Sequence, residues 1–157
     1  MRRDYFTLDV RGLEWVDTGR DPEKPTVVID FEGPASLLQE RITGFSAELL
    51  DDSEIDVSFR YQTVVDDEDA RGVVSVTDRI TGDYVLELNA PAEKVHRFIK
   101  AAREYGKRMG EDDDRYRIEI RIDGEETIAY DKRTFLIYNN EGNLLRKHSL
   151  IPSGVEL

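Results

Sequence analysis

The sequence predicts a single α+β domain in which a large, mostly antiparallel sheet packs against one long and one short helix. Three observations support this prediction: segments that alternate apolar and polar residues, short turn sequences between them, and one long amphipathic stretch. With 157 residues, of which 39% are hydrophobic, the chain is long enough to bury a sizeable core as one domain. We expect this domain to span residues 1–151, with 152–157 as a frayed tail.

The long helix is expected over about residues 90–106, directly after a β-hairpin. Gly72–Thr77 is rich in β-branched residues and Tyr84–Leu88 is largely apolar, while Thr81-Gly82-Asp83 between them has turn chemistry. Pro91 then suits the first turn of a helix, where its missing N–H costs nothing. On a helical wheel, seven residues form a stripe wide enough to face a core: Val95, Phe98, Ile99, Ala102, Tyr105, Gly106 and Met109.

The other elements follow from the same periodicities. A short helix is expected over about residues 34–42, with Leu37, Leu38 and Ile42 facing inward. Residues 12–25 should be a loop whose first part touches the core near Trp15. Strands are predicted at Asp4–Arg11, Thr26–Glu32, Glu54–Val65, Arg115–Asp123, Glu126–Asp131, Thr134–Tyr138 and Asn143–Ser149. The cleanest alternation is in Glu54–Val65, which should therefore be the longest strand.

Two segments resemble each other within the chain. Val28–Ala35 and Val85–Ala92 share the order strand, corner, Pro-Ala and helix. This similarity indicates a duplicated ββα unit. Alternatively, any strand that enters a helix through a proline corner has this pattern, and we favour this second interpretation.

Charge is the strongest global signal. The chain has 34 acidic and 22 basic residues, a formal net charge of −12, and no cysteine. The excess of carboxylates argues against general nucleic-acid binding, because such binding needs basic side chains to neutralise phosphates. Without cysteine there are no disulfides, thiolate metal sites or cysteine nucleophiles. No apolar run is long enough to cross a membrane, so we expect a soluble cytoplasmic protein.

The acidic residues are clustered, and the basic residues are mostly arginine. Runs of acid occur at Asp51-Asp52, at residues 66–69 and at residues 111–114. Such a composition is typical of proteins that work in molar salt, where charge repulsion is screened within about 3 Å. We therefore predict that monovalent salt is required for stability. An acidic mesophilic protein and a nucleic-acid mimic are the alternatives.

No catalytic, cofactor-binding or metal-binding residue can be assigned from the sequence. His96 and His148, the only histidines, each lack a second ligand or an orienting carboxylate at a defined spacing. The acidic clusters can supply oxygen ligands to Mg²⁺ or Ca²⁺, but their spacing does not match an EF-hand loop. Nucleophile and phosphate-loop motifs are absent from the sequence. We therefore expect no cofactor and lean against an enzyme.

Charged side chains on two faces are candidates for an interaction surface. The outer face of the long helix carries Arg97, Lys100, Glu104 and Lys107, and one predicted strand presents Arg115, Arg117 and Arg121. These side chains can meet an anionic partner. The more common use of the strand arginines is pairing with acidic neighbours across the sheet.

Three stretches carry a resemblance to a known family. The sequence GVVSVTDRITGDYVLELN, the helix RFIKAAREYG and the amino-terminal MRRDYFTLDV resemble a family of small uncharacterised acidic proteins from halophilic archaea, a domain of unknown function. The resemblance extends over most of the chain. It implies a high-salt habitat, and it brings no activity, cofactor or catalytic residue that could be carried over to this chain.

Two functional hypotheses follow. The first is a non-enzymatic cytoplasmic binding or assembly module that associates with a protein or with itself, through a sheet edge or an uncovered sheet face. The second is a small-molecule-binding or hydrolytic domain with its site between the helix and the sheet. A fully packed helix–sheet interface would exclude the second hypothesis.

Overall fold

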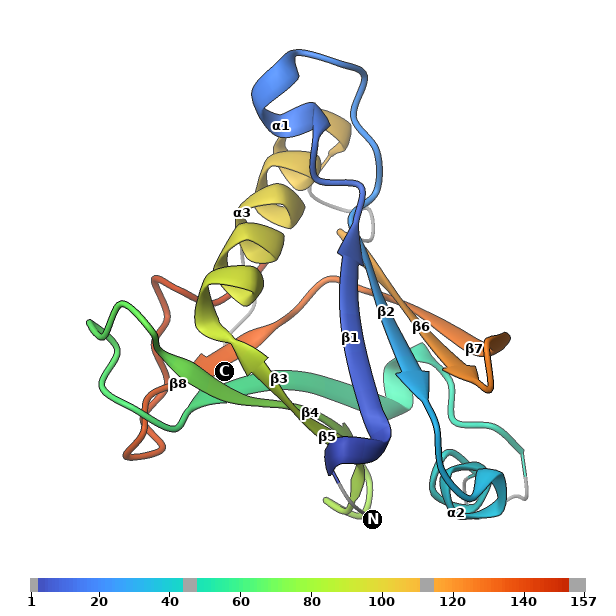
Figure 1. Ribbon diagram of the computed structural model, residues 1–157. Helices are drawn as coiled ribbons and strands as arrows, with labels where there is room; N and C mark the ends of the chain where they lie inside the picture. Colours follow the sequence, from blue (N-terminus) through green and yellow to red (C-terminus); the bar gives the residue numbers. More distant parts are fainter. Residues whose placement is uncertain (1–2, 44–47, 111–114, 153–157) are drawn as a thin grey trace.

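The computed structural model describes residues 3–43, 48–110 and 115–152, and it has the α+β architecture expected from the sequence (Figure 1). Its long helix and its short second helix are both present near the expected positions. In chain order the elements are η1 (Arg3–Tyr5), β1 (Phe6–Arg11), α1 (Trp15–Thr18), β2 (Thr26–Phe31), α2 (Ala35–Arg41), η2 (Asp52–Glu54), β3 (Ile55–Tyr61), β4 (Arg71–Asp78), β5 (Tyr84–Pro91), α3 (Ala92–Met109), β6 (Tyr116–Ile122), β7 (Glu125–Lys132) and β8 (Leu136–Tyr138).

The strands form two four-stranded sheets rather than the one large sheet expected. The first sheet has the order β1-β2-β6-β7 and the second has the order β5-β4-β3-β8. Strands that follow each other in the chain pair antiparallel within each sheet. The pairs β2–β6 and β3–β8, which are distant in the chain, are parallel. Alternation predicts that a segment is a strand, but it does not say which distant strand becomes its neighbour. The division into two sheets therefore could not be read from the periodicity.

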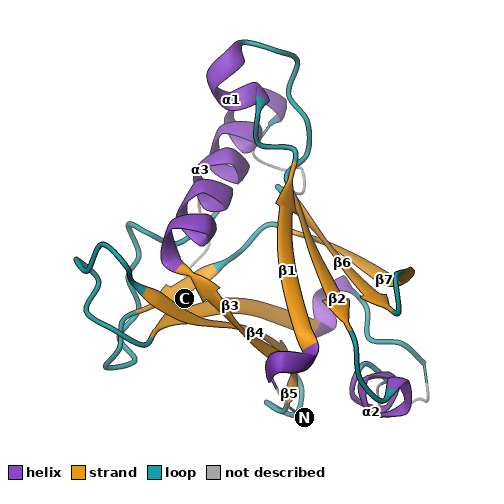
Figure 2. Cartoon of the chain, in the orientation of Figure 1, coloured by secondary structure: helices purple, strands orange, loops and turns teal. Residues whose placement is uncertain are grey.

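One hydrophobic core lies between the inner faces of both sheets and α3. The inward residues of β6 are fully buried and alternate with outward polar residues, which is the period-two pattern of a half-buried strand. From α3, Phe98 packs its ring 5.3 Å from that of Tyr116 in the first sheet. Phe59 and Val74 of the second sheet belong to the same cluster. Figure 2 shows α3 rising from one side of the second sheet.

The helix α3 follows the amphipathic prediction with shifted ends. It begins at Ala92 because β5 continues to Pro91, and it ends at Met109, before Gly110. Within the predicted stripe, Val95, Phe98, Ile99, Ala102 and Gly106 are buried. Met109 at the end of the helix is 49% exposed. The stripe was therefore correct for the central turns of α3 and wrong for its last residue.

Several smaller predictions need correction. The strand β3 is shorter than β4, β5 and β7, because the chain leaves the sheet after Tyr61. Leu37 is 42% exposed, whereas Leu38 and Ile42 are buried as expected. Residues 143–149 form no strand, because only Leu144 makes an isolated bridge, to Tyr138, and residues 146–148 form a turn. Of the predicted frayed tail, residues 153–157 lie outside the described residues.

The predicted loop of residues 12–25 contains the short helix α1. Trp15 in α1 is 2% exposed, and its indole donates a hydrogen bond of 2.6 Å to the carbonyl of Gly12. The Arg108 guanidinium lies 5.0 Å from the centre of the Trp15 ring. Figure 1 shows α1 beside the far end of α3. The expected contact with the core is made by Leu13, whereas Trp15 is buried against the end of α3.

The two segments that resemble each other occupy equivalent local positions. Pro34 precedes α2 and Pro91 precedes α3, and both have extended backbone. A hairpin comes before each helix, β1–β2 in one case and β4–β5 in the other. Any proline corner between a strand and a helix has this geometry, so duplication and local chemistry both remain compatible with the fold.

Candidate functional site

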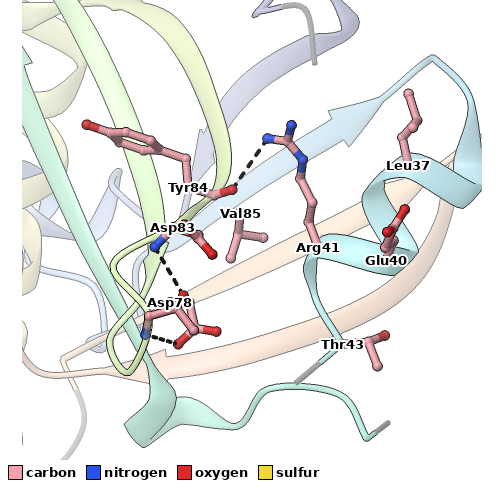
Figure 3. Close-up of a pocket in the computed structure, with 9 residues that line it drawn as sticks. Leu37, Glu40, Arg41, Thr43, Asp78, Asp83, Tyr84 and Val85 are labelled. Carbon is pink, nitrogen blue, oxygen red and sulfur yellow. Dashed lines mark hydrogen bonds between the residues drawn. The ribbon is translucent and has the colours of Figure 1, made fainter. Parts of the chain in front are cut away.

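A first hollow lies between α2 and the β4–β5 hairpin (Figure 3). It has a volume of about 690 Å³, and its lining includes Glu40, Asp78 and Asp83. Arg41 extends toward the hairpin, where its Nη1 donates a hydrogen bond of 3.4 Å to the carbonyl of Tyr84. Asp78 accepts a hydrogen bond of 2.9 Å from the backbone N–H of Ile80 in the hairpin turn. Arg41 and Asp78 therefore use their hydrogen bonds to hold the hairpin backbone. They do not converge on a point in the hollow.

A second hollow has a very different electrostatic character. It lies between the second half of α3 and the C-terminal segment and has a volume of about 340 Å³. Its lining consists of Arg103, Lys107, Arg115, Arg146, Lys147, Ser149 and Ile151. Five of these seven residues are basic and, among the described residues that line it, none is acidic. We call this hollow the basic groove.

Helix periodicity supplies one wall of the basic groove. His96, Lys100, Arg103 and Lys107 follow each other at spacings of four, three and four residues, which places them on one ridge of α3. Two of them, Arg103 and Lys107, line the groove directly. The acidic residues of α3 lie on the neighbouring face, where Glu104 binds Arg108 at 3.2 Å. The helix thus separates a basic ridge from a mixed face.

Arg115 lies against α3 because the helix has a glycine at that point. Arg115 is 6% exposed, and a Cβ added to Gly106 would lie 2.8 Å from its Nε. Any larger residue at position 106 would therefore displace the guanidinium group. The glycine in the last turns of α3, which costs helix stability, is explained by this close approach.

Hydrogen bonds fix the C-terminal wall of the groove. Arg103 donates from Nη2 to the carbonyl of Ser149 at 3.0 Å and to the carbonyl of Lys147 at 3.4 Å. The Ser149 hydroxyl donates a hydrogen bond to the carbonyl of Leu145 at 2.8 Å and accepts one from the backbone N–H of Ile137 at 2.8 Å. This segment is therefore tied both to α3 and to β8. Within the described part of the chain, no ion pair involves Lys107, Arg146 or Lys147.

The two histidines, which looked isolated in the sequence, lie side by side next to the groove. The ring centres of His96 and His148 are 5.4 Å apart, and the Tyr61 hydroxyl is hydrogen bonded to Nε2 of His96. Burial, followed by repulsion from His148, lowers the pKa of His96. Burial, together with the charge of Asp66, raises the pKa of Tyr61. Both shifts favour a hydrogen bond between a neutral phenol and a neutral imidazole.

The residues predicted for interaction are distributed over three places. Lys107 and Arg115 meet in the basic groove, and Arg97 and Lys100 are exposed on α3. Glu104 is held by Arg108, as described above. The outward arginines of β6 face a carboxylate of their own strand: Arg117 lies 3.3 Å and Arg121 lies 2.9 Å from Glu119.

Sequence reasoning missed Arg103, Arg146 and Lys147 as members of a common site. The spacing along α3 and the run Arg146-Lys147-His148 were visible signals for two separate basic surfaces. Nothing local indicates that these surfaces face each other, because the C-terminal segment is placed beside α3 by contacts between residues far apart in the chain. The same reason explains why the histidine pair was not predicted.

Among the described residues, the space between α3 and the sheets is almost completely filled by side chains. The space there, lined by apolar residues that include Val57, Phe98 and Ile118, measures about 10 Å³. That is about the volume needed for one water molecule. The second functional hypothesis, which places a site at this interface, therefore finds no room there.

Other features of the described residues also bear on function. No group of three or more histidine, aspartate or glutamate side chains in the described part of the chain is placed to hold a metal ion. None of the described helices combines the length and apolarity that a membrane crossing requires.

Comparison with known proteins gives one result. Neither the curated proteins nor the solved structures include a match to the chain. A family model described as a family of unknown function, DUF5793, matches residues 1–157. The predicted resemblance to a domain of unknown function is thereby confirmed over the full length. The chain belongs to the DUF5793 family.

Proposed function

We propose that the protein is a non-enzymatic binding module of the cytoplasm, and that the basic groove receives the anionic group of its ligand. The observation that supports this proposal is the segregation of charge. In a chain with a net charge of −12, five basic side chains line one hollow, and three of them, Lys107, Arg146 and Lys147, have no recorded ion pair among the described residues. Like charges gathered in one place raise the energy of the folded chain unless a counter-charge is bound.

The composition of the groove favours a phosphate-type ligand. Three of the five basic residues are arginines, whose planar guanidinium groups bind phosphate oxygens in pairs. A volume of about 340 Å³ is within the range of small-molecule sites and accommodates a phosphate or diphosphate group. The acidic remainder of the surface repels a long polyanion, so general nucleic-acid binding is not expected.

Titration with inorganic pyrophosphate tests the proposal. We expect saturable binding, measured by calorimetry or by amide shifts of the residues that line the groove. Lys107→Gln and Lys147→Gln should each weaken binding about tenfold, because each removes a charge-assisted contact of about 1.5 kcal/mol or more. Neither side chain has a recorded ion pair among the described residues, so both variants should fold.

Arg97→Gln is the matched control, because it removes one positive charge from an exposed position of α3 outside the groove. It should change the affinity by less than twofold. Equal losses in the control and in the groove variants would show that only net charge matters. Such a result, or an absence of pyrophosphate binding, would reject the proposal.

Association with a protein or with a second copy belongs to the same proposal. The strand β7 lies at an edge of the first sheet, and edge strands can pair with a strand of another chain. Light scattering in molar KCl measures the oligomeric state. A dimer that persists at high salt would support assembly, and a strict monomer would restrict the module to ligand binding.

Adaptation to high salt is proposed from the composition. At low ionic strength the excess of 12 negative charges repels over a Debye length of about 10 Å, against about 3 Å in molar salt. We expect cooperative unfolding, followed by Trp15 fluorescence, when KCl is dialysed away. Sucrose at equal osmolality is the control and should not replace KCl. Full stability in dilute buffer would assign the acidity another cause.

A further inference from the structure

The outer face of the second sheet contains a trough that is separate from the basic groove. Its volume is about 700 Å³. Its lining includes Ser58, Arg60, Ser75, Tyr84, Glu87 and Tyr138. The α3 helix rises from the opposite side of this sheet (Figure 2). The trough and the groove share no lining residue.

Strand register explains why this face is hollow. Ser58 of β3 lies directly opposite Ser75 of β4, and Ser75 lies opposite Glu87 of β5. In the next row, Val73 lies between Arg60 and Asn89. The middle of the face thus carries small side chains, and its margins carry long ones. A sheet face with this distribution is concave even where its backbone is regular.

The floor of the trough offers hydroxyl groups that the described protein does not use. Ser75 is 8% exposed, yet the structure records no hydrogen bond from its hydroxyl to any described residue. The same holds for the hydroxyl groups of Ser58, Tyr84 and Tyr138. Most sheltered polar groups in proteins have a hydrogen-bond partner. Because Ser75 lines the trough, its hydroxyl is placed to bind a ligand or water there.

Both margins of the trough are held in place. On the β8 side, Arg60 donates from Nη2 to the carbonyl of Asn140 at 3.2 Å. That carbonyl belongs to a turn in which the Asn139 side chain accepts from the N–H groups of Glu141 and Asn143, at 3.0 and 2.9 Å. On the β5 side, Arg3 binds Glu87 at 3.3 Å. The walls are therefore built by contacts within the chain.

The charges of the trough largely cancel, in contrast to those of the basic groove. Arg3 and Glu87 neutralise each other, which leaves Arg60 as the single unpaired charge on the described lining. An anion would gain little here compared with the groove. A protein interface is also poorly matched, because the centre of a protein interface is apolar and this floor carries the hydroxyl groups of Ser58 and Ser75.

From this chemistry we infer that the trough on the outer face of the second sheet binds a small uncharged polyhydroxylated molecule, a sugar or polyol. Vicinal hydroxyl groups both donate and accept hydrogen bonds, as do Ser58, Ser75 and the two tyrosines. The Arg60 guanidinium and the Glu87 carboxylate add a donor and an acceptor at opposite margins. Tyr84, which is 52% exposed, provides an aromatic surface for the C–H face of a sugar ring.

Saturation-transfer NMR on the full chain tests this inference with four probes: glucose, galactose, mannose and glycerol. We expect transfer to at least one of them in molar KCl, with amide shifts in β3 and β4. The double variant Ser58→Ala and Ser75→Ala should weaken binding by at least tenfold. It should fold normally, because neither hydroxyl has a recorded protein partner.

Thr7→Ala is the matched control, because it removes one hydroxyl from β1 in the first sheet, away from the trough. It should leave sugar binding unchanged. Absence of transfer to all four probes, or binding that the double serine variant leaves intact, would overturn the inference. Pyrophosphate added at saturation should not displace the sugar, and competition between them would also contradict two separate sites.

Discussion

The two sheets share one core through their inner faces, but their outer faces carry different chemistry. On the first sheet, Glu119 forms ion pairs with Arg117 and Arg121 of its own strand. Lys24 forms another ion pair with Asp131 of β7 at 2.8 Å. On the second sheet, the central outward residues are Ser58 and Ser75, whose hydroxyl groups have no recorded partner among the described residues. On the first face the charged groups are mostly paired within the chain, with Arg121 Nε the exception, whereas the two central serine hydroxyl groups of the second face have no recorded partner.

This difference shows where recognition can occur. Charged groups that already bind each other lose those contacts when a ligand arrives, so the ligand must compensate for them. Sheltered groups without a protein partner have no such contacts to lose. On the outer face of the second sheet, the Ser58 and Ser75 hydroxyl groups have no recorded partner among the described residues, and in the basic groove Lys107, Arg146 and Lys147 have no recorded ion pair.

The largest expected effect concerns the shared core and not the outer faces. A Cβ at Gly72 of β4 would lie 2.3 Å from the carbonyl oxygen of Arg60 and 2.5 Å from the ring of Phe59. Because the carbonyl is held in the sheet, Gly72→Ala should destabilise the protein by about 3 kcal/mol, measured by denaturant unfolding in molar KCl. Gly82→Ala, in the open hairpin turn, has no atom within 4 Å and should cost about 1 kcal/mol from backbone strain alone. Similar losses in both variants would show that β4 can shift away from β3.

A smaller loss should follow from breaking the charged contacts on the first sheet. The Glu119 side chain is 16% exposed and serves two arginines. Glu119→Gln should cost about 1–2 kcal/mol, between the values for exposed and buried ion pairs. The exposed pair Arg79–Asp56 is the comparison, and Arg79→Gln should cost less than about 0.5 kcal/mol. Urea unfolding at two KCl concentrations measures the loss of stability in both variants. Equal losses would show that the Glu119 contacts on the first sheet contribute no more than an exposed ion pair.

The response to pH should be smaller and should arise beside the second sheet, where Tyr61 meets His96. Because the pKa of His96 is lowered in the folded state, the unfolded chain binds a proton first as the pH falls. The stabilising contribution is therefore complete above the unfolded pKa of about 6.5 and is lost as the pH falls through the folded pKa.

The half-buried ring limits this effect to about a few tenths of a kcal/mol per pH unit between pH 7 and 5.5. Urea unfolding at several pH values measures the slope. His96→Gln should remove it, and His148→Gln should reduce it by removing the repelling neighbour. A slope that persists in His96→Gln would assign the pH dependence to carboxylates instead.

Local chemistry predicted the elements of this fold better than their arrangement. The apolar spacing of Val95, Phe98, Ile99 and Ala102 identified the buried side of α3, because a helix fixes its own geometry. The parallel pairing of Ile29 in β2 with Ile120 in β6 joins segments far apart in the chain, and nothing in either segment selects the other. The two-sheet arrangement therefore required the structure.

For the candidate sites too, the sequence predicted some of the residues but not how they come together. Lys107 and Arg115 were predicted as interaction residues from charge alone, but their convergence with Arg146 depends on the C-terminal segment. Ser58 and Ser75 gave no signal, because a serine in an alternating strand is an ordinary outward residue. Only the register of β3 and β4 places the two hydroxyl groups opposite each other and makes them a floor.

The smallest expected effect is the sharpest test of the difference between the faces. Ser75 is sheltered, so loss of a hydrogen-bonded hydroxyl at this position would cost about 1 kcal/mol. Because the structure records no partner for it among the described residues, Ser75→Ala should change the free energy of unfolding by less than about 0.3 kcal/mol in the absence of ligand. Ser149→Ala is the matched control, since the equally sheltered Ser149 hydroxyl makes two hydrogen bonds and should cost about 1–2 kcal/mol. A comparable loss at both serines in urea unfolding would mean that the second face, like the first, is satisfied within the chain.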